Sequence, residues 1–337
     1  MKAIGGYPEL ELRKGEHYHK DAIKLNTARN CLEYILLARK YRKVYVPYYT
    51  CDAVLEPFSK PSLRQTKTEF YHITEELKPA LLPELKDGEA FLYTNYFGLM
   101  QNTVEGLTEI YGNRLIVDNS QAFFDMPYPR IDTFYSARKF FGIPDGSYLY
   151  TDAVLEDYNG SEIETDRSFD RMDALLKRID LGAESGYGDF QAIEHNLCLQ
   201  PIKKMSRLTE AILSSIDYEQ VKKRRQENYE TLNFALAGIN SIALEFNEKT
   251  VPLCYPLLDA SSSLRRYLIA EKIFVPTYWP NVQKYCTENS LEYELVKNLV
   301  PLPIDQRYEN NDMKRITLKI LGEHSNLEKR GILYIKK

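Results

Sequence analysis

Short strand-like runs alternate with helix-like stretches between residues 20 and 150, and this alternation limits the fold more than any other feature of the sequence. Strands are expected in the runs 43–49, 68–73, 90–98, 114–119, 132–137 and 146–151. Helix-like stretches such as 103–112 fall between several of them. Such alternation is typical of a mostly parallel sheet that helices cover on both faces. The sequence therefore predicts an α/β domain.

The remaining chain predicts a helical region and then a second, smaller domain. Residues 165–235 have mainly helical patterns, which "AGIN" interrupts near residue 238. Beyond it, the strand-like runs "IALEF" and "VPLCYPLL" precede the helix-like "SLRRYLIAEK" and "NNDMKRITLKILGEH". We therefore expect a large α/β domain over residues 1–238 and a small C-terminal α+β domain over residues 239–337.

Composition and charge argue against several functions. The net charge of −4 over 337 residues does not favour nucleic-acid binding, and "KKRR" at 222–225 is interpreted as a solvated helix face because acids surround it. No run reaches the roughly 18 apolar residues of a membrane helix, and the N-terminal segment turns polar too early for a secretory signal. The five cysteines include no C-x-x-C pair, which indicates free thiols in a reducing compartment such as the cytoplasm. The five histidines are scattered without metal-ligand spacing, so no metal site is expected.

A carboxylate and a lysine follow neighbouring strand-like runs. Asp118 ends "RLIVD" with Gln121 shortly after it, and Lys139 follows the next run in "SARKFFG". Ligands of open α/β sheets bind beyond the C-terminal ends of the strands. There, a lysine and a carboxylate suit pyridoxal phosphate (PLP), because the lysine forms a Schiff base and the carboxylate keeps the pyridine nitrogen protonated. Asp118 alone also fits a turn, and Lys139 alone also fits an exposed surface. Their order and strand context favour the cofactor.

Two further features suit the cofactor phosphate. Ser136 and Lys139 form S-x-x-K, which would place the serine hydroxyl near the phosphate. "NTARN" opens a helix after the strand-like "AIKL", so backbone N–H groups and Arg29 are candidates to hold the phosphate at a helix N-terminus. Neither feature is specific alone, since S-x-x-K occurs by chance and Arg29 equally fits a solvated position.

Taken in order, these segments resemble the DegT/StrS-type sugar aminotransferases, a branch of PLP-dependent transferase fold type I, over nearly the whole chain. "LNTARNCLEYILLA" resembles "NGTAALHLAL", and "VYVPYYTCDAVLEPF" resembles "VIVPxFTFxATANAV". "LIVDNSQAFF" is similar to "IEDAAQAHG", and "FYSARKFFGIPDGSYLYT" is similar to "FSFHPTKNLGxxGDGGAVVT". The aspartate and lysine segments are the specific ones.

The resemblance implies a role for each matching residue. Asp118 would pair with the pyridine nitrogen, and Gln121 would contact the O3′ side of the ring or pack near the cofactor. Lys139 would form the Schiff base and later move a proton between the substrate carbon and the cofactor. Ala28 and Arg29 occupy the Gly-Thr positions that contact the phosphate in the family.

One departure from the family concerns the cofactor ring. Many members stack an aromatic side chain on the ring from the position that is Cys51 here. Tyr48 or Tyr49 would have to supply a ring face instead, and we favour Tyr49.

The other departure concerns assembly. Fold type I sites are built between two subunits, so the resemblance implies a homodimer. The family segment "GYNYRMSEL", which crosses that interface, is "QPIKKMSRL" at 200–208. Lys203 or Lys204 would replace the lost contact with the partner's phosphate, and the change puts a nucleotide-linked substrate in doubt. We expect the apolar residues Leu199, Ile202 and Met205 to be buried against a partner. The alternative is an ordinary turn packed on its own subunit.

The function expected is a PLP-dependent aminotransferase acting on a keto-sugar, possibly nucleotide-linked, with glutamate as the usual donor. It would serve surface polysaccharide or amino-sugar biosynthesis. A non-catalytic or regulatory protein that retains the cofactor is the main alternative, and a sugar-nucleotide-binding module without cofactor is another. Related sugar dehydratases carry histidine at the lysine position, so Lys139 argues against that reaction.

Overall fold

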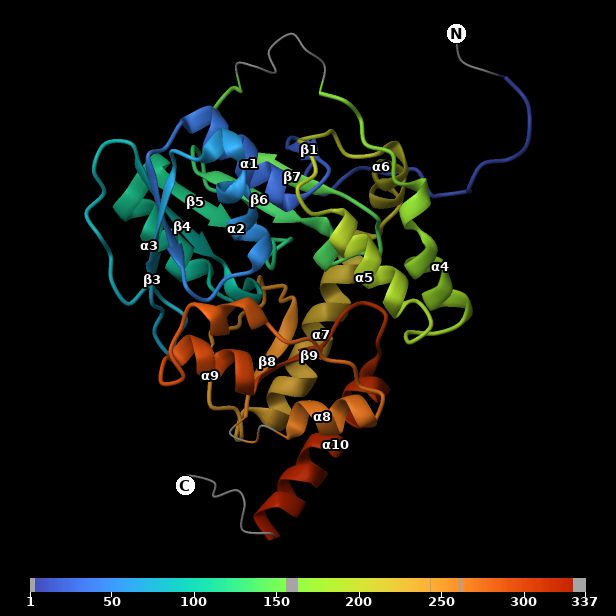
Figure 1. Cartoon of the computed structure of the whole chain (residues 1–337). Helices are drawn as coiled ribbons and strands as arrows, with labels where there is room; N and C mark the ends of the chain where they lie inside the picture. Colours follow the sequence, from blue (N-terminus) through green and yellow to red (C-terminus); the bar gives the residue numbers. More distant parts are fainter. Residues whose placement is uncertain (1–3, 156–162, 243, 260, 262, 330–337) are drawn as a thin grey trace.

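A seven-stranded sheet forms the large domain of the computed structural model, which describes residues 4–155, 163–242, 244–259, 261 and 263–329 (Figure 1). The strand order is β1-β7-β6-β5-β4-β2-β3. Strands β2 to β6 are parallel, whereas β7 runs antiparallel to both of its neighbours. The strands are β1 (Ile23–Leu25), β2 (Lys43–Pro47), β3 (Lys67–Tyr71), β4 (Glu89–Thr94), β5 (Leu115–Asp118), β6 (Asp132–Ser136) and β7 (Ser147–Tyr150). The mostly parallel sheet confirms the fold class.

Helices cover both faces of the sheet, because successive strand residues point to opposite sides. On one face, Ala90 and Leu92 of β4 share a core with α1 (Ala28–Arg39), against which α2 (Asp52–Ser59) packs. On the other face, Phe91 and Tyr93 share a core with α3 (Gln101–Tyr111) and with the C-terminal region. The parallel strands are thus buried on both sides.

The small domain continues this second core. Its two strands, β8 (Cys254–Leu258) and β9 (Leu299–Pro303), pair antiparallel. The long helix α7 (Tyr218–Leu236) packs on β8 and α10, and these elements lie below the sheet in Figure 1. The helices of the small domain are α8 (Leu264–Ala270), α9 (Leu291–Asn298) and α10 (Asn310–Lys329).

Among the described residues between β7 and α7 there are three further helices: α4 (Asp173–Asp180), α5 (Tyr187–Asn196) and α6 (Arg207–Ser214). They occupy the region expected to be helical. Short 3₁₀ turns occur at η1 (Pro61–Leu63), η2 (Tyr96–Gly98), η3 (Gly112–Arg114), η4 (Ala137–Lys139), η6 (Phe169–Arg171) and η7 (Pro280–Lys284). Among the described helices, none combines the length and apolarity needed to cross a membrane.

The strand expected at 242–246 is wrong for the residues of this run that are described, 242 and 244–246, which are irregular. Phe246 stacks on Tyr229 of α7, with ring centroids 4.3 Å apart. Its apolar side chain is therefore partly buried by packing on a helix, without strand pairing.

Candidate functional site

One pocket contains most of the residues expected at the site. It opens at the C-terminal ends of β4, β5 and β6, where parallel strands share one edge of the sheet. Six of the expected residues line it: Ala28, Arg29, Asp118, Gln121, Ser136 and Lys139. Tyr49 and Lys204 do not line it.

Asp118 is the last residue of β5, and its side chain is only 4% exposed. Its Oδ1 accepts a hydrogen bond from the Ser120 N–H at 2.8 Å. Burial raises the pKa of the Asp118 carboxyl group, and the bond from Ser120 and the charge of Lys139 oppose this only in part. A buried carboxylate of this kind suits a cationic partner, and a protonated ring nitrogen is one.

The side-chain oxygen of Gln121 has a hydrogen-bond partner, whereas its side-chain nitrogen has none in the described chain. Its Oε1 accepts a hydrogen bond from the Phe97 N–H at 2.8 Å. Its Nε2 is buried and finds no partner within the described part of the chain. Buried donors are rarely left unpaired, so this amide suits an acceptor on a molecule bound in the pocket. The residues present therefore fit the ring of the expected cofactor.

Lys139 lies in the turn η4, which directly follows β6. Its side chain is exposed, and its Nζ lies 5.9 Å from the ring centroid of Tyr278, a residue of the small domain. The next residue, Phe140, is held from two directions. Its carbonyl oxygen accepts a hydrogen bond from Gln306 Nε2 at 2.9 Å, and the Arg225 guanidinium lies 4.5 Å from its ring centroid.

Arg225 corrects the interpretation of "KKRR" as a fully solvated helix face. It is 1% exposed, and burial lowers the pKa of its guanidinium to about 10. Its Nη1 donates to the carbonyl oxygens of Pro252 and Leu253 at 3.2 and 3.1 Å, and its Nε donates to Gln306 Oε1 at 3.1 Å. These bonds join α7 and the small domain to the backbone that follows Lys139.

The start of α1 forms the end of the pocket where the cofactor phosphate is expected. Thr27 caps the helix, since its Oγ1 accepts from the Asn30 N–H at 3.3 Å. Arg29 is already paired, because its Nη1 lies 2.7 Å from Glu56 Oε2 and both side chains are only 11% exposed. The other oxygen of Glu56 accepts from the Leu199 N–H at 2.7 Å. Phosphate binding by Arg29, which stays a prediction, requires this carboxylate to give way.

The aromatic residues that line the pocket, Phe134 and Trp279, are not the ones expected. Tyr49 is fully buried outside the pocket, and its hydroxyl donates to the Tyr278 carbonyl oxygen at 3.1 Å. Tyr48 stacks on Phe70. Neither tyrosine lines the pocket, whereas Cys51 and Trp279 do. Trp279 is the single tryptophan of the chain, and its position in the Pro-rich "VPTYWP" is the signal that could have drawn attention to it.

The segment 196–206 packs largely on its own subunit. Ile202 and Met205 are 4% and 1% exposed within the cores of this chain, so the expectation that a partner buries them is wrong. Leu199 remains 62% exposed. Lys203 does not line the pocket of its own subunit, and its Nζ lies 3.6 Å from Glu164 Oε2. Lys204 is exposed. A contact from Lys204 to a partner's phosphate stays a prediction.

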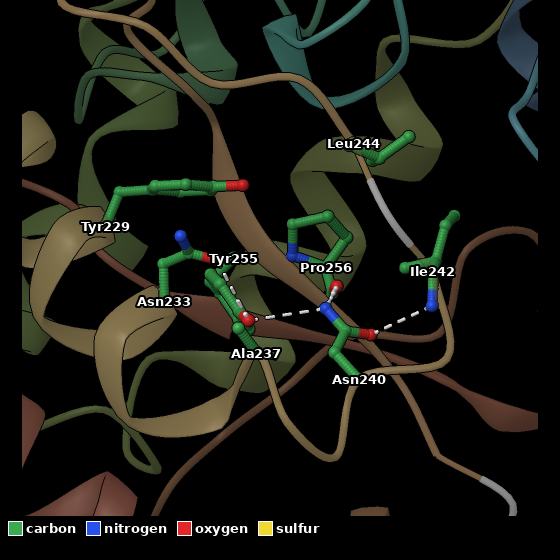
Figure 2. A pocket seen from close by; sticks show the side chains of 8 residues that line it. All are labelled: Tyr229, Asn233, Ala237, Asn240, Ile242, Leu244, Tyr255 and Pro256. Carbon is green, nitrogen blue, oxygen red and sulfur yellow. Dashed lines mark hydrogen bonds between the residues drawn. The ribbon is translucent and has the colours of Figure 1, made fainter.

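A second pocket lies between the end of α7 and β8 (Figure 2). The Nδ2 of Asn240 donates to the Pro256 carbonyl oxygen at 2.9 Å, and its Oδ1 accepts from the N–H groups of Ile242 and Leu258 at 3.3 and 2.9 Å. These bonds attach the loop after α7 to β8, so the pocket's polar groups serve the fold. Nowhere among the described residues do three or more metal-ligating side chains gather into a metal site.

Comparison with solved structures finds the same arrangement of a mostly parallel sheet and a small antiparallel sheet in aminotransferases. Among solved structures, the chain is similar to DesV from S. venezuelae, determined with a ketimine intermediate (16% identity, TM-score 0.62, covering 89% of this chain and 83% of that one). It is similar to a DegT DnrJ EryC1 StrS aminotransferase from Brucella abortus (16%, 0.59, 90% and 86%). It is also similar to NtdA from Bacillus subtilis with bound cofactor PMP (14%, 0.62, 88% and 72%).

No family model and no curated protein matches the sequence. Because the identities are near 15%, these likenesses establish the fold, and the expected fold type is confirmed.

Proposed function

We propose that the protein is a PLP-dependent aminotransferase that transfers an amino group to a keto-sugar. The observation that carries the proposal is the joint placement of Asp118, Gln121 and Lys139 in one pocket beyond the sheet. When bound, PLP supplies an electron sink for the reacting carbon. Two structural neighbours, solved with a ketimine intermediate and with PMP, support the same chemistry.

Each pocket residue has a distinct task in this function. The Asp118 carboxylate keeps a proton on the ring nitrogen, and Gln121 Nε2 donates to the ring oxygen. The Lys139 amine attaches the cofactor and then holds and moves the proton of the reacting carbon. Ser136, Arg29 and the N–H groups that open α1 bind the phosphate.

Absorbance and mass spectrometry test the proposal. Purified protein supplied with PLP should turn yellow, and glutamate alone should bleach the band because it completes half of the reaction. A yellow protein that no amino donor bleaches supports the non-catalytic alternative, and a protein that takes up no PLP refutes both. A screen of free and nucleotide-linked keto-sugars, with the amino product read by mass, then identifies the substrate.

A homodimer with shared sites is part of the proposal. The resemblance implies it, and several apolar side chains on and beside α4 and α5 are exposed and available to a partner: Leu176, Ile179, Leu181, Tyr187 and Phe190. Replacing Lys203 and Lys204 with alanine together should weaken PLP binding if one of them reaches the partner's phosphate. A protein that sediments as a monomer at micromolar concentration while fully active contradicts the dimer.

A further inference from the structure

We propose that Arg138 recognises an oxyanion of the substrate, either a carboxylate or a phosphate group. We further infer that Glu194 takes the place of this oxyanion when no substrate is bound. The inference rests on the proposed function and names the chemistry of the group that the pocket selects. The residue is not part of the family pattern: where this chain has Arg138 in "SARK", the family segment has threonine.

Arg138 is placed to meet a substrate. It directly precedes Lys139 in η4, and both side chains line the pocket. Glu194 reaches the same pocket from α5, and the Nη2 of Arg138 donates to its Oε1. The Arg138 side chain is 17% exposed, and that of Glu194 is 38% exposed.

The ion pair with Glu194 uses only one of the two N–H donors on one edge of the Arg138 guanidinium. The Nε–H and an Nη2–H of arginine point in the same direction and bind the two oxygens of one carboxylate or phosphate. Glu194 engages Nη2 alone, and the buried Nε of Arg138 has no partner in the described parts of the chain. An anion with two suitably placed oxygens would satisfy both donors. Glu194, already partly hydrated, can then turn to solvent.

The other cations of the pocket have different tasks. Among the described lining residues, the cations are Arg29, Arg138 and Lys139. Arg29 is paired with Glu56 at the start of α1, and Lys139 is assigned to the cofactor. Arg138 is therefore the lining cation left to bind a substrate, and its planar fork suits an oxyanion better than a neutral hydroxyl group.

Isothermal titration calorimetry on the full-length, PLP-loaded protein tests the proposal with two unreactive probes, glutarate and inorganic pyrophosphate. Arg138→Gln should weaken at least one probe about tenfold or more, since a charge-assisted bidentate contact is lost. Glu194→Gln should strengthen the same probe about threefold or more, because it removes an internal competitor of modest strength. An effect on glutarate identifies the carboxylate of the amino donor, and an effect on pyrophosphate identifies the phosphate of a nucleotide-linked acceptor.

Arg171→Gln is the matched control. Arg171 Nη2 pairs with Asp166 Oδ2 at 2.8 Å and its Nε is buried without a hydrogen-bond partner in the described chain, as in Arg138, but it does not line the pocket. This variant should leave both probe affinities unchanged. Arg138→Lys keeps the charge and loses the fork, so it should give an intermediate loss and serves if the glutamine variant does not fold.

The proposal is overturned if neither the Arg138 nor the Glu194 variants change either probe affinity. It is also overturned if Arg138→Gln weakens PLP alone, because Arg138 would then serve the cofactor. Neither titration requires turnover, and both are repeated on the cofactor-free protein. A failure of glutamate to bleach the PLP band would therefore defeat the proposed function without deciding the probe result.

Discussion

Replacing Asp118 with asparagine separates two effects of its carboxylate: its cost to the stability of the cofactor-free protein and its contribution to cofactor binding. In the cofactor-free protein the charge is unfavourable, since burial raises the pKa of Asp118 above its ordinary value of 3.8. The folded state then binds the proton more tightly than the unfolded state does. Stability consequently falls as the pH rises from 3.8 through the raised pKa, and the loss is complete above it.

Asparagine keeps the shape and the acceptor for the Ser120 N–H but removes the charge. Without PLP, Asp118→Asn should therefore be more stable than the parent at pH 7, by about 1.4 kcal/mol for each unit of the pKa shift. The two proteins should converge below pH 3.8, where the carboxyl group is protonated in both states. With PLP the order reverses, because the lost hydrogen bond to a charged ring nitrogen is worth about 1.5–3 kcal/mol. That corresponds to PLP binding about 10- to 150-fold weaker, and transamination should fall about 10²-fold or more.

Thermal unfolding of the cofactor-free proteins between pH 3.5 and 8, together with absorbance titrations of PLP, measures both effects. Asp125→Asn is a control, because burial raises the pKa of Asp125 to about 6 and this residue lies outside the pocket. Its replacement should change the pH dependence of stability and leave PLP affinity intact. An Asp118→Asn protein that binds PLP as tightly as the parent, with normal half-reaction rates, refutes the assigned role.

Four further substitutions test contacts in and near the pocket. Lys139→Arg should fold and lose the cofactor adduct that borohydride traps; peptide mapping of that adduct to another lysine would contradict the assignment. Arg29→Ala should weaken PLP binding, whereas the reaction rate in excess PLP should fall less. The reason is that a contact between Arg29 and the cofactor phosphate is equally strong in the ground state and the transition state. Glu56→Gln should strengthen retention instead, and unchanged PLP affinities in both variants argue for a purely structural pair. Asp145→Ala should lower the unfolding free energy by about 3 kcal/mol or more in denaturant titrations, since it removes a buried carboxylate that accepts from the N–H and Oγ of Ser206 at 2.8 and 2.6 Å. A fall in unfolding free energy of less than about 1 kcal/mol would show that the bonds from Asp145, which lies between η4 and β7, to the start of α6 contribute little.

The sequence was sufficient for the residues whose position follows from local pattern. Asp118 ends a strand-like apolar run, and Lys139 follows the next one, so the parallel sheet alone brings them to one edge. Gln121 could be placed for the same reason, because only a short turn separates it from β5.

The residues that were missed depend on contacts between distant segments. Arg225 belongs to a charged run whose neighbours are solvated, and its burial arises from bonds to segments 27 to 81 residues further along the chain. Trp279 enters the pocket only because the small domain packs against the sheet domain. Tyr49 and Cys51 are two residues apart, but the first is buried in the core while the second lines the pocket as the cap of α2. No periodicity in that short turn distinguishes the two positions.

The two pocket arginines share an arrangement that bears on selectivity. Each is paired with a glutamate, and each glutamate also involves the segment 187–199: Glu194 lies on α5, and Glu56 accepts from the N–H of Leu199 just beyond it. An entering oxyanion must displace an internal carboxylate, which lowers its affinity relative to an unpaired arginine. A neutral molecule that displaced the glutamate would leave the arginine without an anionic partner. It offers no charge to replace the lost ion pair, so its binding would be less favourable. If Arg29 and Arg138 bind oxyanions as proposed, the two pairs would discriminate by charge, and displacing Glu194 would break its contact from α5 to the turn that carries Lys139.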